Sequence, residues 1–347
     1  MRLSGLDALH ENIVQLRLIS QVNESIRKHF AEDGDLTHGA QKIGAYNYIA
    51  AQNSIPSQLR WRIYDYSAFI TQLYALYESF VFDVIRQWLS FLPSIYPVWD
   101  DLPQKLGSNY RAAIGSVLQK YGGSRTENLT EKSLIEGLYF GVSGRSDYTF
   151  ISDAFFIGLP NLRKADLIDL CRKVGLPDID SWFSNTNSAL GILCVANSFS
   201  VEGQLKNLIE YRNDCAHGPV GIDNLLGAND LFVLGDFVYS LCEVFVEFVQ
   251  SNICQLAEIQ NACWQLGEIT EYYKKADAFI IKTKKTSFAL GESVIIKSNL
   301  RCYYADIISL QKDGSVINTV DTIADDEIGV KLSKPAREGS VILSFKV

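Results

Sequence analysis

The stretch IYDYSAFITQLYALYESFVFDVIRQWLSFLP, residues 63–93, decides the fold class of this chain. Its apolar side chains recur every three or four residues, so they share one face of an α-helix. That face consists of Ile63, Tyr66, Ile70, Leu73, Tyr77, Val81, Val84 and Trp88. Proline has no backbone N–H to donate to the preceding turn, so we expect the helix to stop before Pro93. A helix of this length with one apolar face indicates a helical core.

The same spacing extends over most of the chain. It predicts shorter helices near residues 106–121, 131–139, 162–174 and 201–217, and a very long one from about 229 to 273. Beyond about Lys275, short alternating runs separated by glycine turns predict about six strands, and Asp313-Gly314 is a strong hairpin signal. We therefore expect a mainly α fold. A helical domain would span residues 1–275, with its core at about 63–250, and a small closed β-barrel would span 276–347.

Composition limits the setting in which the chain works. Its 347 residues, 47% of them hydrophobic, can bury a large core. The N-terminus lacks an apolar run with a cleavage site, and three acidic residues interrupt the apolar stretch 231–249, so we expect neither a secretion signal nor a membrane span. The seven cysteines are an odd number and form no CxxC pair. We therefore expect reduced cysteines and a cytoplasmic location.

Charge and histidine spacing narrow the chemistry. A formal net charge of -8 argues against indiscriminate binding to nucleic acid, so a nucleic-acid enzyme would have to concentrate its cations locally. The four histidines do not stand in the spacing of a zinc site. The sequence therefore predicts neither a metal site nor a cofactor.

The sequence LKNLIEYRNDCAHG, residues 205–218, carries the chemical signal. It places Arg212, Asn213 and His217 at the end of an amphipathic helix, before a Gly218-Pro219 stop. An arginine can grip a phosphate with two parallel hydrogen bonds, and a histidine can transfer protons near neutral pH. Asn213 can hold the imidazole or the phosphate. Arg212 and His217 differ by roughly 140° around a helix, so the arginine must reach around it or the last turn must unwind.

This segment resembles the R-N-x-x-x-H form of the HEPN motif, and Arg212, Asn213 and His217 match its three positions. Glu78 resembles the acidic residue that HEPN proteins often carry on an early core helix. The resemblance spans roughly residues 63–249. It implies a bundle of four or more helices that forms a homodimer, with the motifs of both subunits lining one cleft. It also implies RNA cleavage by attack of a 2′-hydroxyl, which leaves a 2′,3′-cyclic phosphate.

Two further resemblances concern biological role. HEPN toxins that a nucleotidyltransferase regulates often carry a tyrosine just after the motif, whereas Gly218-Pro219 follows here. The chain is closer to the larger bacterial HEPN ribonucleases of toxin–antitoxin and phage-defence loci, which implies a toxin or anti-phage effector with an antitoxin or regulatory protein as a partner. The tail resembles the second-domain β-barrel of translation GTPases, which implies a binding or positioning module.

The sequence therefore predicts a metal-independent endoribonuclease that acts on RNA as a homodimer. Two other hypotheses stay open. A non-catalytic HEPN module could bind a nucleotide or a protein, and the acidic balance suits it. In a protein-interaction scaffold, the barrel would recognise the partner and His217 would only cap a helix C-terminus, where a cation suits the helix dipole. Glu78 could equally be a surface or interface salt-bridge partner and not part of the site.

Overall fold

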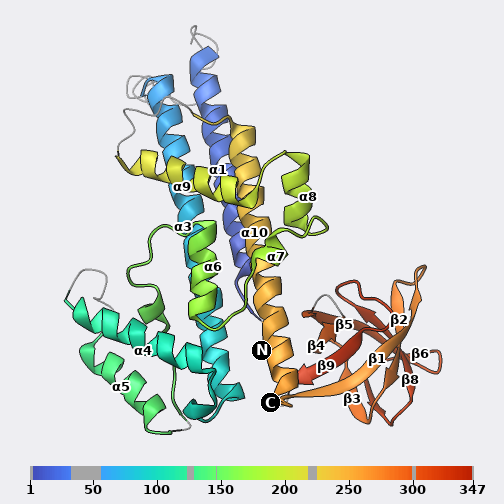
Figure 1. Ribbon diagram of the computed structural model, residues 1–347. Coiled ribbons are helices and arrows are strands. Elements are labelled where there is room, and N and C mark those ends of the chain that lie inside the picture. The colour runs from blue at the N-terminus through green and yellow to red at the C-terminus, as the bar shows by residue number, and fades with distance from the viewer. Residues whose placement is uncertain are drawn as a thin grey trace, which may run out of the picture.

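The computed structural model describes residues 3–32, 56–122, 129–145, 147–217, 225–298 and 302–345. It is mainly helical, with a small C-terminal β-barrel, as predicted (Figure 1). The helices are α1 (Leu6–Glu32), α3 (Gln58–Ile95), η1 (Trp99–Asp101), α4 (Gln104–Gln119), α5 (Glu131–Val142), η3 (Ser152–Phe155), α6 (Lys164–Lys173), α7 (Asp180–Phe183), α8 (Ala189–Ala196), α9 (Val201–His217) and α10 (Ala228–Ile259). The strands are β1 (Cys263–Tyr273), β2 (Ala278–Thr283), β3 (Thr286–Ala289), β4 (Ser293–Lys297), β5 (Cys302–Lys312), β6 (Ser315–Ile317), β7 (Thr319–Thr322), β8 (Glu327–Leu332) and β9 (Val341–Phe345).

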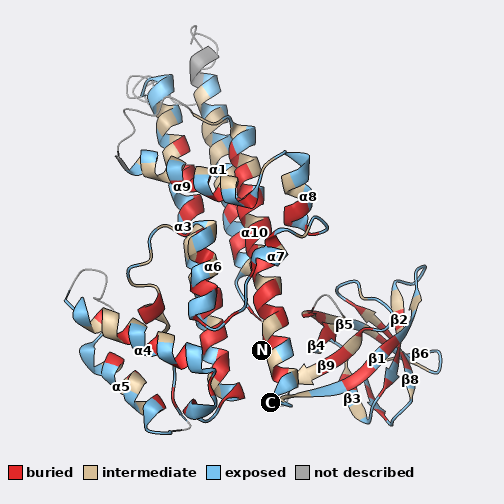
Figure 2. Cartoon of the chain, in the orientation of Figure 1, coloured by how far each residue is buried: buried red, intermediate tan, exposed pale blue. Residues whose placement is uncertain are grey.

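Helix α3 is the central element of the helical domain. Every residue of its predicted apolar face beyond Ile63 is buried, and α1, α9 and α10 pack against it (Figure 2). By length and composition alone α3 would also suffice to cross a membrane, and half of its most apolar window is buried inside the protein. Packing in the protein core is therefore sufficient to explain the apolar face of α3.

The prediction that this helix ends before Pro93 is wrong, because α3 continues to Ile95. Proline removes only its own donor, and the next turn keeps a bond from the Tyr96 backbone N–H to the Leu92 carbonyl at 2.8 Å. Ile95 and Tyr96 are both buried. Burial of these two side chains therefore stabilises the turn that the proline weakens.

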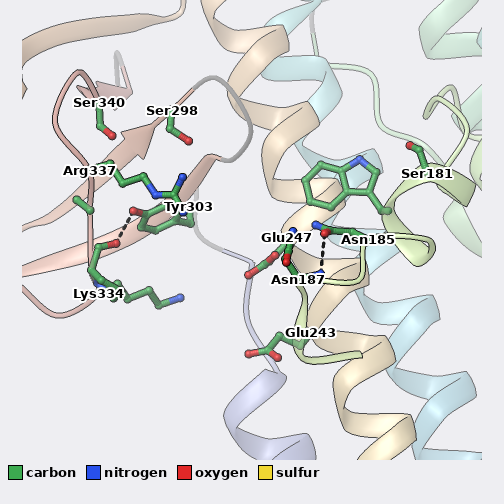
Figure 3. Close-up of a pocket in the computed structure, with 13 residues that line it drawn as sticks. Ser181, Asn185, Asn187, Glu243, Glu247, Ser298, Tyr303, Lys334, Arg337 and Ser340 are labelled. Carbon is green, nitrogen blue, oxygen red and sulfur yellow. Dashed lines mark hydrogen bonds between the residues drawn. The ribbon is translucent and has the colours of Figure 1, made fainter. Parts of the chain in front are cut away.

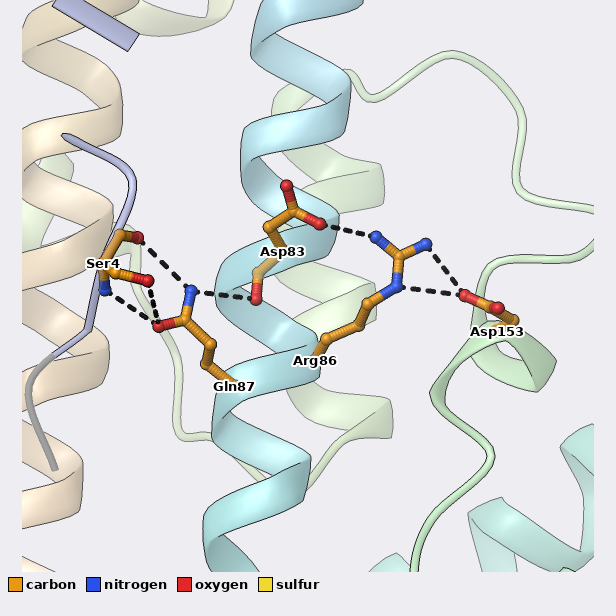
Figure 4. A network of polar contacts seen from close by, with 5 residues as sticks. All are labelled: Ser4, Asp83, Arg86, Gln87 and Asp153. Carbon is orange, nitrogen blue, oxygen red and sulfur yellow. Dashed lines mark hydrogen bonds and ion pairs between the residues drawn. The ribbon is translucent and has the colours of Figure 1, made fainter. Parts of the chain in front are cut away.

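A polar network connects α3 to the N-terminus and to η3 (Figure 4). The Arg86 guanidinium donates to Asp83 at 2.6 Å and to Asp153 at 2.8 Å, and it lies over the Phe156 ring. The next residue, Gln87, accepts from the backbone N–H of Ser4 at 2.8 Å. These side chains are largely exposed, so each pair is worth at most about 1 kcal/mol. The network therefore mainly fixes where the N-terminus and η3 lie against α3, and it adds little to the free energy of folding.

The prediction of one helix from 229 to 273 is wrong in its last part. Helix α10 ends at Ile259, and Cys263–Tyr273 is strand β1, which pairs with β2 and β9. Asn261 adopts a left-handed backbone conformation with φ 52°, which ends helices and which asparagine tolerates better than most residues. The sheet therefore begins ahead of the expected boundary near Lys275.

The C-terminal strands form the closed barrel that the sequence predicts. Its strand order is β4-β9-β1-β2-β8-β5, and the pairing of β5 with β4 closes the ring. Strand β6 adds to β5 through the expected turn, in which Asp313 and Gly314 both have positive φ. The kinship with translation-factor barrels stays a prediction.

Several contacts join the barrel to the end of α10. A disulfide links Cys254 of α10 to Cys302 of β5, so the expectation that all cysteines are reduced is wrong for this pair. Lys297 forms an ion pair with Glu258, and the Phe345 ring packs on Phe91 of α3 with ring centroids 5.8 Å apart. The two domains are therefore held in one arrangement.

Candidate functional site

Helix α9 carries the motif and spans Val201–His217, the range that the sequence predicts. It stays helical to His217, so the last turn does not unwind, and Gly218-Pro219 lies outside the described residues. On a regular helix, Asn213 and His217 project within roughly 40° of each other, while Arg212 projects roughly 140° from His217. Arg212 must therefore act from a different side of α9.

The Arg212 side chain is held by three groups. Its Nη1 donates to Asn213 Oδ1 at 3.1 Å and to Asn161 Oδ1 at 3.3 Å. The guanidinium carbon lies 5.1 Å from the centroid of the Tyr74 ring, in the geometry of a cation–π contact. Arg212, Asn213 and Asn161 are all half-buried. The guanidinium is thus oriented, and it retains donors that could bind a phosphate.

Tyr74 connects this arginine to Glu78. Its hydroxyl donates to Glu78 Oε1 at 3.0 Å and accepts from the Leu162 backbone N–H at 3.1 Å. Burial, followed by the nearby Glu78 carboxylate, raises the pKa of Tyr74 well above its ordinary value, so the hydroxyl keeps its proton at physiological pH. The sequence-predicted residues Glu78 and Arg212 therefore contact opposite parts of one buried tyrosine. We call Tyr74, Glu78, Asn161, Arg212 and Asn213 the arginine cluster.

Two members of the cluster were not among the predicted site residues. Tyr74 lies one helical turn before Glu78 on α3, and an aromatic residue directly after Leu73 of the apolar face predicts only a core residue. Asn161 follows Pro160 in the loop before α6, where asparagine is an ordinary turn residue. Neither position signals a contact with a side chain on α9. Only the packing of the α6 loop against α3 and α9 brings them together.

The structure limits what the other motif residues can do. Burial raises the pKa of the Cys215 thiol, so this cysteine stays protonated near neutral pH and is a poor nucleophile. The backbone places His217 on the last position of α9, and its side chain lies outside the described residues. In the described part of the chain, no group of three or more His, Cys, Asp or Glu side chains could hold a metal ion. The described side chains of this site therefore offer the guanidinium of Arg212 and the amides of Asn161 and Asn213 that orient it.

Comparison with known proteins identifies the helical part of the chain. A family model described as RiboL-PSP-HEPN matches residues 41–251, which is more than half of the chain. The matched range contains Glu78, Asn161 and Arg212.

Other comparisons add little. No curated protein matches the sequence. A solved structure from Geobacillus thermoleovorans, the selenomethionine variant of the C-terminal domain of a protein described as a U32 peptidase, is similar at 12% identity and a TM-score of 0.21. That similarity covers 23% of this chain and 99% of the domain. A likeness at this level assigns no function.

Proposed function

The chain belongs to the RiboL-PSP-HEPN family, and on that basis we propose that it is a metal-independent endoribonuclease. The observation that carries the proposal is the arginine cluster, in which Asn161, Asn213 and Tyr74 orient Arg212 on the helix that ends at His217. A fixed guanidinium can bind a scissile phosphate and stabilise the negative charge that develops on it.

In the proposed reaction, the ribose 2′-oxygen attacks the neighbouring phosphorus and the bond from phosphorus to the 5′-oxygen breaks. The products are a 2′,3′-cyclic phosphate and a 5′-hydroxyl. One base must take the proton of the 2′-hydroxyl, and one acid must protonate the leaving 5′-oxygen. The motif supplies one histidine to a subunit, so we assign one proton transfer to His217 and the other to His217 of the partner subunit.

Dimerisation is therefore part of the proposal. Helix α1 exposes an apolar stripe of Leu18, Ile19, Val22 and Ile26, each at least 40% exposed, in its C-terminal half. Figure 1 shows this half of α1 beside α3, at the end of the bundle that α9 crosses. An exposed apolar stripe along a helix is typical of a homodimer interface. We propose that a two-fold contact in this region brings two α9 helices to one cleft.

The biological role follows as a proposal from the same resemblance. An RNA-cleaving toxin or anti-phage effector in the cytoplasm would need restraint by an antitoxin or regulatory protein. The second candidate function is a non-catalytic HEPN module that binds a nucleotide or a protein. The net charge of -8 favours it, because binding to RNA is driven by cations that neutralise phosphates.

RNA cleavage should survive EDTA and should fail on an all-deoxy substrate of the same sequence. Arg212 would replace the metal as the source of positive charge, and the deoxy strand has no 2′-hydroxyl to attack. A gel assay with 5′-labelled single-stranded RNA measures both results, and the product should end in a 2′,3′-cyclic phosphate. Loss of cleavage on chelation, with recovery on adding magnesium or zinc, would contradict the mechanism.

Tyr74→Phe should lower RNA cleavage roughly tenfold, within the losses that follow when a site is misplaced by about 1 Å. The substitution keeps the ring beneath Arg212 but removes the hydroxyl that joins Glu78 to Leu162. It should also cost about 1–3 kcal/mol of stability, because the buried Leu162 N–H loses its acceptor. Cleavage rate and melting temperature are the two measurements.

The matched control is Tyr77→Phe. Tyr77 lies one turn along α3, and its hydroxyl donates to the Leu162 carbonyl at 3.1 Å. Its loss should destabilise the protein by a similar amount, because it leaves a buried carbonyl without that donor. It should leave cleavage of the folded protein unchanged. Equal losses of cleavage in both variants would show that Tyr74 acts only through stability.

A further inference from the structure

A cavity of about 1080 Å³, lined by both polar and apolar groups, lies between the helical domain and the barrel (Figure 3). Its helical wall comes from α10 and from the segment around α7. Its barrel wall comes from the start of β5 and from the connection between β8 and β9. The volume is slightly above the roughly 300–1,000 Å³ of small-molecule sites, which often lie at domain interfaces. The arginine cluster contributes none of its lining residues.

The barrel wall presents two cations. Lys334 and Arg337 lie on the connection between β8 and β9, and both are exposed. Tyr303 of β5 fixes this connection, because its hydroxyl donates to the Pro335 carbonyl at 2.6 Å. Within the part of the chain that the structure describes, neither cation forms an ion pair. An ammonium and a guanidinium on one short loop can bind the oxygens of a phosphate.

The helical wall presents two carboxylates. Glu243 and Glu247 lie four residues apart on α10, so they point from the same helical face toward the cavity (Figure 3). A carboxylate has about four lone-pair positions and accepts several hydrogen bonds at once. Acidic side chains commonly bind ribose hydroxyls, and they also accept from exocyclic amino groups of bases. This wall can therefore accept hydrogen bonds from the donor-rich end of a polar molecule.

Two aromatic side chains complete the lining. Trp182 of α7 packs edge-on against Phe248 of α10, with ring centroids 5.8 Å apart, and the Tyr303 ring lies on the barrel side. Both are half-buried, so part of each ring faces the cavity. Aromatic rings of this kind stack on nucleobases with roughly 1–3 kcal/mol of binding free energy for each base.

We infer that this cavity binds a nucleotide. Its phosphate lies on Lys334 and Arg337, its ribose or base donors lie on Glu243 and Glu247, and its base packs on Trp182 or Tyr303. The cations of one wall and the hydrogen-bond acceptors of the other match a nucleoside monophosphate, which is anionic at one end and rich in donors at the other. The nucleotide is either a free small molecule or one unit of an RNA strand. The inference does not rest on the proposed ribonuclease activity.

Calorimetric titration of the full chain with AMP, CMP, GMP and UMP tests this inference, with inorganic phosphate and adenosine as partial ligands. At least one monophosphate should bind in a 1:1 complex and at least about tenfold more tightly than either partial ligand, because each wall contributes. Lys334→Gln/Arg337→Gln should weaken that binding roughly 10- to 100-fold, the loss expected for charged hydrogen bonds. Glu243→Ala/Glu247→Ala should weaken nucleotide binding but not phosphate binding, because it removes acceptors for the ribose or the base and none for the phosphate.

The matched control is Lys284→Gln/Lys285→Gln, which removes the same charge from exposed barrel residues outside the cavity. This variant and Arg212→Ala should bind the nucleotide as the unaltered chain does. A 2′-O-methyl octamer, which cannot undergo 2′-hydroxyl attack, distinguishes the two sources when it is titrated into Arg212→Ala, so that the arginine cluster does not contribute. Tighter binding than the monophosphate indicates an RNA strand, and weaker binding indicates a free nucleotide. The inference is wrong if no monophosphate binds at millimolar concentration, if phosphate alone binds as tightly, or if the control variant loses as much affinity as Lys334→Gln/Arg337→Gln.

Discussion

His217→Ala should lower RNA cleavage by roughly 10²–10⁴-fold, the loss expected when a general acid or base is removed. Histidine is the motif residue that can both take and give a proton near neutral pH. The backbone places it at the last position of α9, four residues after Asn213. Alanine is the best helix former, so the helix itself should persist. Single-turnover cleavage of a labelled RNA, measured on the folded variant, gives the effect.

The competing interpretation is that His217 only favours the helix C-terminus as a cation. Such an interaction is worth about 0.3–1 kcal/mol at an exposed position, so its loss would lower the melting temperature slightly and leave cleavage intact. The matched control is His10→Ala, which removes an exposed imidazole on α1 that packs on the Tyr239 ring. It should leave the cleavage rate unchanged. A rate for His217→Ala that equals the rate for His10→Ala would eliminate the catalytic role.

Local patterns in the sequence were sufficient to predict much of this fold. The apolar face of α3 and the bounds of α9 depend on side-chain spacing within one element, and both are confirmed. The hairpin at Asp313-Gly314 is confirmed because only a few residue types tolerate positive φ at both turn positions. Closure of the barrel also follows from local alternation, because an open sheet of this size would leave unpaired edges.

Strand β1 shows where local pattern misleads. Its register shifts between Gln265 and Gly267, where it pairs with β9, and between Ile269 and Glu271, where it pairs with β2. Each irregularity interrupts the two-residue alternation, and the buried Leu266 and Ile269 end up three residues apart. That spacing is also the spacing of a helix, so the sequence favoured a continuation of α10. Asn261 was the signal in the sequence for the helix end, because asparagine tolerates the left-handed conformation that it adopts there.

Contacts between residues far apart in the sequence could not be predicted either. The motif and Glu78 are recognisable as residue types, but Asn161 precedes Arg212 by 51 residues and reaches it only through the loop before α6. Cys254 and Cys302 are separated by 48 residues, and an odd set of cysteines does not specify which two pair. Such contacts depend on tertiary packing, which residue spacing does not encode.

A mixed dimer of one unaltered subunit and one His217→Ala subunit should cleave RNA at least roughly 10²-fold more slowly than the unaltered dimer. If acid and base come from two subunits, every cleft of the mixed dimer lacks one of the two proton-transfer groups. Two independent sites would instead leave half of the activity, and a cleavage assay readily distinguishes this result from a roughly 10²-fold loss.

Co-expression with two different affinity tags isolates the mixed dimer. A dimer carrying one His10→Ala subunit, which should retain full activity, is its control. Sedimentation under the assay conditions must show a dimer. A monomer that cleaves RNA, or a mixed dimer at half the full rate, would contradict the shared cleft and confine the chemistry to the arginine cluster and His217 of a single chain.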